Sequence, residues 1–168
     1  RPFFNSNLMD LSQNPYVSAP EVNSKSVAGV VHFYHDGQPI VVTVGISAVS
    51  IEGARRNLEA ECPGFDFEAV RFVANKKWET ALSRITVESD NVAQKRTFYT
   101  ALYHTLLAPN VWSDTDGQYR GMDNQIHRAD HPVYTVFSLW DTYRAANPLH
   151  ALLEPDRMRD FIRTFLLQ

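Results

Sequence analysis

The chain has 168 residues, of which 44% are hydrophobic and 21% are charged. These proportions are typical of a folded globular domain and exclude a disordered protein. The formal charge of −3 is distributed over both halves of the chain, which argues against a dedicated nucleic-acid or membrane-surface binder. A single cysteine, Cys62, excludes an internal disulfide framework. No apolar run approaches the roughly 20 residues that cross a bilayer.

The first part of the sequence predicts β structure. Residues 1–26 are rich in Asn, Ser and Pro, which indicates an irregular segment with at most a short strand. Two strand-like runs follow at 27–35 and 40–49, and the second alternates apolar and polar residues with the period of a half-buried strand. Asp36 and Gly37 favour a tight hairpin turn between them. Because a lone hairpin is marginal in water, we expect these strands to belong to a larger sheet.

Helical patterns follow the strand-like runs. A short helix is predicted over 50–61, before Pro63-Gly64. Asp66 is a favourable N-cap for a second helix, whose apolar residues recur every three or four positions. A third helix is predicted over about 92–107, before Pro109. Its second half is apolar on nearly all sides, which is typical of an inner helix with several neighbours.

A long polar and aromatic stretch covers residues 108–134. Loops of this length inside compact domains are uncommon and tend to carry function. Beyond it, helices are predicted over 138–146, from Asn147-Pro148, and from Pro155 to the end of the sequence. The last helix places its apolar residues on one stripe: Met158, Phe161, Ile162, Phe165 and Leu166. Strands followed by helices, with no stop signal at the end, predict a piece of a larger protein.

The aspartates of the long loop allow two interpretations. Asp114 and Asp116, with Gly117, supply the clustered oxygens and the turn that Ca²⁺ sites use. The spacing differs from that of an EF-hand loop, because glycine stands at the fourth position and Gln125 at the twelfth. Asx-turns and a turn that requires glycine explain the same residues without an ion, and we favour this second interpretation of a hairpin-like loop.

Three histidines are candidates for functional residues. His127 and His131 lie four residues apart, which is the spacing of two metal ligands on a helix. The segment between them is polar and not periodic, and no glutamate of a zinc hydrolase motif accompanies them, so we expect no metal role. His104 lies in the apolar half of the third predicted helix and is interpreted as a core histidine with satisfied hydrogen bonds.

Residues 134–144 form the richest candidate site. Trp140 and Asp141 are adjacent at a predicted helix start, and Arg144 follows three positions after the aspartate. Sugar sites use this combination, because an aromatic ring stacks on C–H faces while a carboxylate accepts hydrogen bonds from hydroxyls. The alternative is structural, with Trp140 in the core and Asp141 paired with Arg144 or capping the helix. The pattern alone leaves both interpretations open.

Several longer motifs occur together in the chain: residues 44–47, 54–59, 78–85, 98–110, 114–123 and 134–144. In this order they resemble glycoside hydrolase family 92, the bacterial exo-acting α-mannosidases, many of which are α-1,2-specific. The resemblance extends over about residues 27–168. Because several long motifs share one order, it is more specific than an isolated glycine or histidine pattern.

The resemblance implies a mixed fold, β first and then α. Residues 1–49 would form the C-terminal strands of an N-terminal β-sandwich domain. Residues 50–91 would be linker helices, and residues 92–168 the first helices of a catalytic (α/α)6 barrel. The family protein is several times longer, so this chain would cover only its middle.

The resemblance also implies an activity, namely calcium-dependent inverting hydrolysis of terminal α-1,2-linked mannose from N-glycans or mannans. The catalytic acid, the catalytic base and the Ca²⁺ ligands of the family are expected beyond residue 168. No catalytic residue and no metal ligand is therefore assigned in this chain. Trp140 and Asp141 match the family motif whose aspartate lines the pocket for the terminal mannose, and they are assigned as substrate-binding residues.

The implied partners are a mannose-containing glycan and the remainder of the mannosidase chain, in a bacterial periplasm or outside the cell. We expect the isolated chain to be inactive, because a site without either carboxylate cannot direct binding energy to bond cleavage. The alternative function is a non-enzymatic carbohydrate-binding or interaction module.

Overall fold

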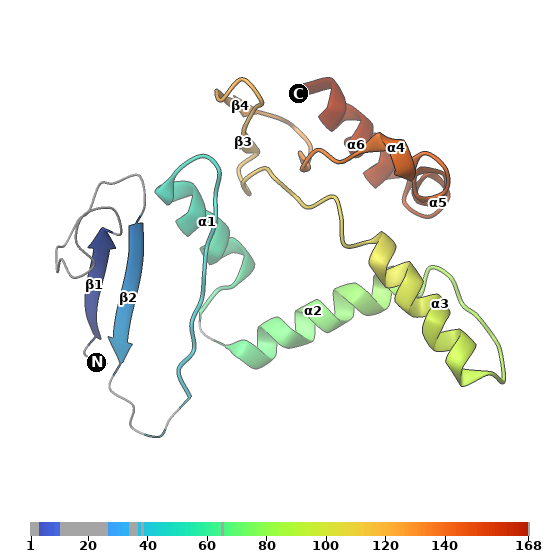
Figure 1. The fold of residues 1–168 in the computed structure, drawn as a ribbon, viewed down its shortest axis with the longest axis horizontal. Coiled ribbons are helices and arrows are strands. Elements are labelled where there is room, and N and C mark those ends of the chain that lie inside the picture. The colour runs from blue at the N-terminus through green and yellow to red at the C-terminus, as the bar shows by residue number, and fades with distance from the viewer. Residues whose placement is uncertain (1–3, 11–26, 34–36, 38, 65, 168) are drawn as a thin grey trace. The chain divides into compact units, whose positions relative to one another are not determined.

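The computed structural model describes residues 4–10, 27–33, 37, 39–64 and 66–167. The chain divides into two compact units, Arg1–Ile40 and Val41–Gln168, whose elements are labelled in Figure 1. In the described part of the first unit, β1 (Phe4–Asp10) pairs antiparallel with β2 (Val27–Phe33). The strand predicted at 27–35 is therefore confirmed, and the short strand allowed near the N-terminus is its partner.

The strand predicted over residues 40–49 is wrong. The segment 39–47 carries no strand pairing with any residue that the structure describes. Alternation shows which residues would share a face, but a strand forms only where a partner supplies its hydrogen bonds. Of the predicted turn at 36–39, Gly37 has a left-handed φ of +88°, while Asp36 and Gln38 lie outside the described residues.

The first two helices begin where the sequence predicts. The Ser50 side chain caps α1 (Ile51–Glu61) by accepting a hydrogen bond from a first-turn amide at 2.9 Å. The Asp66 carboxylate caps α2 (Phe67–Leu82) in the same way, also at 2.9 Å. Short polar side chains are favoured at these positions because the first N–H groups of a helix have no partner inside it.

The third helix, α3 (Val92–Thr105), packs against α2 through the rings of Trp78 and Tyr103, whose centroids are 4.5 Å apart. Within the described chain α2 buries no residue and α3 buries only Leu102. The expected inner helix with several neighbours is therefore not formed by these residues alone. The apolar positions that led to this prediction remain largely exposed.

The long loop contains a second antiparallel pair. β3 (Gln118–Arg120) pairs with β4 (Ile126–Arg128), and the two strands form a small hairpin (Figure 1). Gly117 before the hairpin has a φ of +83° and Asn124 in its tip a φ of 62°. Glycine and asparagine are the residues that adopt this left-handed region most readily. The predicted hairpin-like loop at 108–134 is confirmed.

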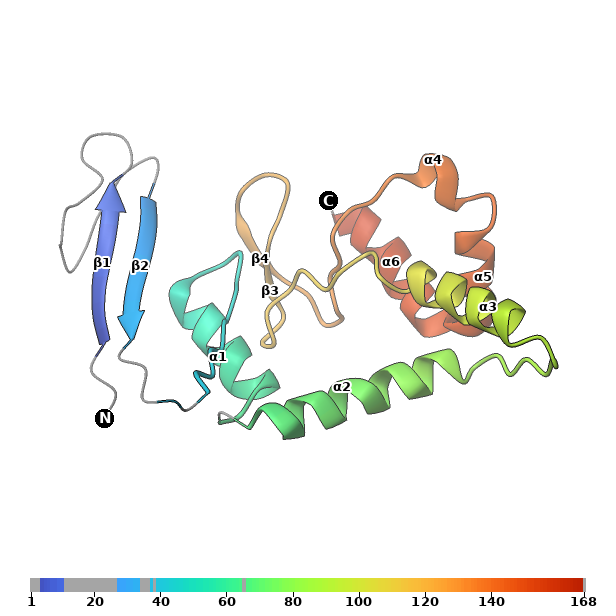
Figure 2. The ribbon, with the colours of Figure 1, turned by 60° about the horizontal axis from the view of Figure 1, so that its bottom comes forward.

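Three helices follow the hairpin: α4 (Leu139–Thr142), α5 (Ala146–Leu153) and α6 (Pro155–Leu167). The helix predicted over 138–146 is shorter than expected and ends at Thr142. Pro155 occupies the first position of α6, as predicted, because its missing N–H needs no partner there. Figure 2 shows these three helices following one another along the chain.

The core of the second unit includes one side of α6. Val133, Thr164 and Phe161 are 0%, 1% and 3% exposed. Ile162 and Leu166 are 52% and 82% exposed, so the stripe predicted for this helix is only partly covered. The reason is geometric, because the apolar stripe of α6 is wider than the surface that the described chain offers it.

The regular secondary structure of the described chain is mostly helical, with two small antiparallel sheets, and β structure precedes α structure as predicted. The β-sandwich and the (α/α)6 barrel remain predictions, since the described elements complete neither. In the described part of the chain, none of the helices has the length and apolar character needed to cross a membrane.

Candidate functional site

The predicted substrate-binding pair, Trp140 and Asp141, lies in the short helix α4. Ser138 caps this helix, its hydroxyl accepting from the Trp140 amide at 3.3 Å. The Thr142 hydroxyl donates to the Ser138 carbonyl at 3.1 Å and closes the turn. Within the described residues Trp140 is 76% exposed, whereas the structural alternative places it in the core.

The carboxylate of Asp141 is also open, with 79% of its side chain exposed. The Arg144 guanidinium lies 3.6 Å from Asp141 Oδ1, beyond hydrogen-bond distance. An exposed pair of this kind contributes little to stability. The two predicted residues thus present an apolar ring and a carboxylate next to each other, and the carboxylate oxygens are available to a ligand.

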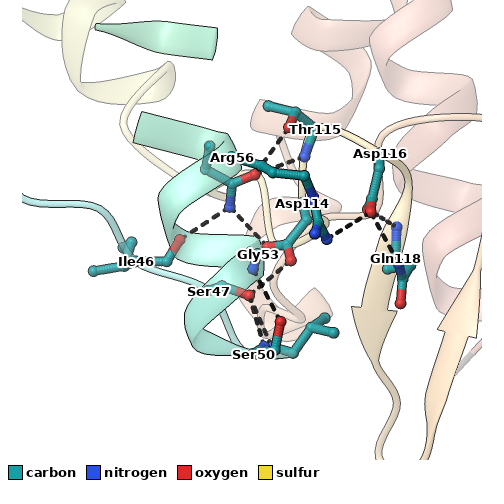
Figure 3. Close-up of polar contacts among 11 residues, drawn as sticks. Ile46, Ser47, Ser50, Gly53, Arg56, Asp114, Thr115, Asp116 and Gln118 are labelled. Atoms are coloured by element: carbon teal, nitrogen blue, oxygen red, sulfur yellow. Dashed lines mark hydrogen bonds and ion pairs between the residues drawn. The ribbon is translucent and has the colours of Figure 1, made fainter. Parts of the chain in front are cut away.

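A second polar cluster is centred on Asp114 and lies between helix α1 and the hairpin (Figure 3). Asp114 is only 5% exposed, and Ser47 Oγ donates to its Oδ2 at 2.7 Å. Asn57 Nδ2 donates to its Oδ1 at 2.8 Å. Both oxygens of this buried carboxylate are therefore satisfied by protein groups, as a buried charge requires.

The same cluster joins helix α1 to the long loop. Asn57 Oδ1 accepts from the Thr115 amide at 2.9 Å and from its hydroxyl at 3.0 Å. Gly53, one turn earlier on α1, has no room for a side chain, because a Cβ would overlap Asp114 Oδ2 and lie 2.7 Å from Ser47 Oγ. We call Ser47, Gly53, Asn57, Asp114 and Thr115 the Asp114 anchor, since they fix the loop to α1.

Asp116 takes part in a neighbouring turn. Its carboxylate accepts from the Gln118 amide at 3.0 Å and lies 2.9 Å from the Arg56 guanidinium. The hydrogen bond from the Gln118 amide is the main cause that lowers the pKa of Asp116, and the Arg56 charge adds to it. This is the Asx-turn that the sequence favoured over an ion site.

The residues present do not fit a calcium ion. No group of three or more His, Cys, Asp or Glu side chains among the described residues could hold a metal. The two aspartates that suggested one, Asp114 and Asp116, accept hydrogen bonds from protein donors instead. Donors directed at the carboxylate oxygens occupy the positions that ligation would need.

The two spaced histidines bind different carboxylates. His127 Nε2 lies 2.9 Å from Asp123 Oδ2, and His131 Nδ1 lies 2.9 Å from Asp130 Oδ1. Both contacts are local, at four residues and one residue of separation. The two rings do not converge on a common ligand.

The prediction of a core histidine at His104 is wrong. His104 is exposed on α3, next to the Tyr103 ring. The buried histidine is His150, which is 6% exposed and packs edge-on against Phe161 at 5.9 Å. The apolar run around His104 signals a face that the described chain leaves uncovered, so burial could not be inferred from its neighbours in sequence.

The sequence does not mark the Asp114 anchor as a unit. A signal was present, since Gly53 and Asn57 lie four residues apart and therefore on one face of α1. A glycine and an amide on the same helical face indicate close contact with a polar segment. Nothing in the sequence showed that this segment would be Asp114, more than 50 residues away.

Residues 53–168 match the sequence profile of the glycosyl hydrolase family 92 catalytic domain. The GH92 α-mannosidase BT3965 from Bacteroides thetaiotaomicron is 30% identical, with a TM-score of 0.76 over 99% of this chain and 24% of that chain. The GH92 family glycosyl hydrolase ccman5 is 22% identical, with a TM-score of 0.79 over 97% of this chain and 22% of that chain. The GH92 inverting mannosidase BT2199 from Bacteroides thetaiotaomicron VPI-5482 is 23% identical, with a TM-score of 0.69 over 97% of this chain and 23% of that chain. No curated protein matches the sequence.

The fold and the sequence match together define a segment of a glycoside hydrolase catalytic region. The chain belongs to glycosyl hydrolase family 92. It spans 22–24% of the length of the solved structures that it matches.

Proposed function

We propose that the full-length protein is an exo-α-mannosidase and that Trp140 and Asp141 line its pocket for the terminal mannose. The observation that carries this proposal is the 30% identity to an α-mannosidase over 99% of the chain. That relative has also been solved in complex with mannoimidazole. The open arrangement of Trp140 and Asp141 supports the assignment.

Each residue of the pair would perform a distinct task. The exposed face of the Trp140 ring offers apolar area to the C–H face of a pyranose. The Asp141 carboxylate would accept hydrogen bonds from sugar hydroxyls remote from the bond being cut, and such charge-assisted bonds are stronger than neutral ones. The Arg144 guanidinium lies beyond hydrogen-bond distance of this carboxylate and leaves its oxygens to the sugar.

The finer features of the proposal concern the remainder of the protein. Inverting hydrolysis needs an acid and a base about 6.5–9.5 Å apart on opposite faces of the sugar. Neither carboxylate is assigned to this chain, and BT2199 is described as an inverting mannosidase. We propose α-1,2 specificity and calcium dependence, with the ion held outside residues 1–168, where it would polarise the substrate.

The proposed architecture keeps the divisions drawn from the sequence. Residues 1–49 would close a β-sandwich, residues 50–91 would link the domains, and residues 92–168 would open the (α/α)6 barrel. We propose a periplasmic or secreted location, which fractionation of cells expressing the protein would test. Recovery of the protein from the cytoplasm alone would contradict it.

The proposed function is tested by mannose release from the full-length protein. We expect free mannose from α-1,2-mannobiose, loss of this activity after chelation, and recovery with Ca²⁺. The anomer formed first, followed by NMR, should be the opposite of that in the substrate. Glycan binding without hydrolysis of any α-mannoside would instead support the non-enzymatic carbohydrate-binding module.

A further inference from the structure

A cavity of about 500 Å³ lies against the hairpin, apart from the exposed pair on α4. Its lining includes three aromatic or aliphatic side chains with open surface, namely Trp112, Met122 and Val136, which are 39%, 68% and 47% exposed. Arg120 and Asn124 contribute polar groups to the same wall. Small-molecule sites have this volume range and this mixture of apolar walls with a few polar groups.

Trp112 is held rigidly at the edge of the cavity. Its indole N–H donates to the Arg120 carbonyl at 2.9 Å, and its backbone amide donates to the Val133 carbonyl at 2.7 Å. The ring is therefore fixed although more than a third of the residue is exposed. A fixed aromatic ring binds an apolar surface with little further loss of side-chain freedom.

Arg120 supplies a donor beside this ring. Its Nε donates to the Ala48 carbonyl at 2.7 Å and one terminal nitrogen donates to the Asn124 carbonyl at 2.8 Å. The other terminal nitrogen has no hydrogen-bond partner among the residues that the structure describes. A guanidinium held by two carbonyls is positioned in advance for a ligand oxygen.

The cavity and the proposed mannose pocket are connected through one short stretch of chain. Val136 lines the cavity, and Trp140 follows it by four residues. Four residues span at most about 14 Å, so the two sites lie within the reach of a short oligosaccharide. A polymeric substrate held at α4 would therefore extend past the hairpin if it leaves the pocket on this side.

We propose that the cavity lined by Trp112, Arg120 and Met122 is a subsite for a sugar residue of the glycan remote from the terminal mannose. Trp112 provides the stacking face and Arg120 a donor to a hydroxyl. This inference rests on the proposed function, because it assumes that a mannose-containing glycan is bound at α4. The cavity carries apolar walls and one cation, which suits a neutral, hydroxylated pyranose.

The test compares long and short substrates on the full-length protein. For wild type and W112A, kcat/KM is measured with an α-1,2-linked mannotetraose and with an aryl α-mannoside that cannot reach the subsite. We expect the ratio of the two values to fall about tenfold in W112A, mainly through KM for the tetrasaccharide. W112F keeps an aromatic ring and should retain most of the ratio, and V111A, an exposed neighbour outside this cavity, should leave it unchanged.

Met122 gives a second variant that does not depend on the hydrogen bond of Trp112. Met122 lines the same cavity, so M122A should lower the same ratio by a smaller factor, and its melting temperature checks that the variant folds. The subsite proposal would be overturned if the ratio of the two kcat/KM values were unchanged in both W112A and M122A. An equal loss of kcat/KM on both substrates would overturn it as well. Failure of the wild-type protein to release mannose from either substrate would refute the proposed function itself, which this readout reports separately.

Discussion

The Asp114 anchor makes one substitution unusually informative, namely Gly53→Ala in helix α1. An alanine Cβ at this position would overlap Asp114 Oδ2 and lie 2.7 Å from Ser47 Oγ. In an ordinary exposed helix the same change would be favourable, because alanine is the better helix former. The structure therefore predicts a sign opposite to the one that helix propensity gives.

The magnitude follows from three contributions. Overpacking a tight contact costs about 1–3 kcal/mol. Displacing the Asp114 carboxylate weakens a hydrogen bond to a charged group, worth about 1.5–3 kcal/mol. The gain in helix propensity offsets about 1 kcal/mol. The net expectation is a loss of about 2–4 kcal/mol in the local stability of the anchor.

Amide hydrogen exchange of the full-length protein measures this loss locally. The reporters are the Asp114 amide, which donates to the Gln118 carbonyl at 2.8 Å, and the Thr115 amide, which donates to Asn57 Oδ1 at 2.9 Å. Their exchange should accelerate about 30-fold or more in G53A. The matched control is Glu59→Ala, an exposed position on the same helix, which should leave both rates unchanged.

A double-mutant cycle decides whether Asp114 is the cause. In a D114A background the carboxylate that opposes the Cβ is gone, so Gly53→Ala should cost little or even stabilise. Equal costs of Gly53→Ala in the presence and absence of the Asp114 carboxylate would refute the reasoning. Unchanged exchange in G53A would refute it directly.

Three further predictions follow from the same residues. Burial lowers the pKa of His150 from its ordinary 6.5, so the unfolded chain takes up the proton first and stability should be lost as the pH falls below about 6.5. H150Q should flatten this pH dependence when the free energy of unfolding is measured by urea titration across that range. Equal pH dependence in wild type and H150Q would contradict the prediction. Gly117→Ala forces a side chain at a φ of +83° and 2.6 Å from the Ala129 carbonyl, so thermal unfolding of the full-length protein should begin at lower temperature than for wild type. Purified residues 1–168 should release no mannose from any α-mannoside, and detectable turnover would show that catalytic groups lie within this segment.

Local signals in the sequence predicted the helices well. Ser50 and Asp66 cap α1 and α2, and Pro155 begins α6, because each of these residues satisfies or avoids a terminal N–H by itself. The hairpin around Gly117 was also predictable, since a left-handed φ is a property of that residue and its turn.

Pairing and burial were less predictable because they depend on distant residues. The alternation over 40–49 predicts a strand, yet β2 pairs with β1 instead. His104 was assigned to the core and is exposed, while His150 is buried against Phe161. In both cases the sequence shows that a residue is apolar or lies on an apolar face, but not what covers that face.

The residues of the candidate sites also differ in how well the sequence predicts them. Trp140 and Asp141 were selected from their adjacency and from a family motif, and the structure places both on the exposed turn of α4. The Asp114 anchor is not evident from the sequence, because its partners come from segments far apart in the chain. Long-range polar contacts of this kind leave only a weak local signal, here the spacing of Gly53 and Asn57 on α1.

The most direct test of the central claim is the kinetics of Asp141→Asn in the full-length protein. This change keeps the shape of the side chain but removes the charge that the sugar hydroxyls would contact. We expect kcat/KM for α-1,2-mannobiose to fall about a hundredfold, with the melting temperature nearly unchanged because the substitution keeps the size and shape of the side chain. Normal kinetics with a large loss of stability would contradict the assignment and make Asp141 a structural residue of α4.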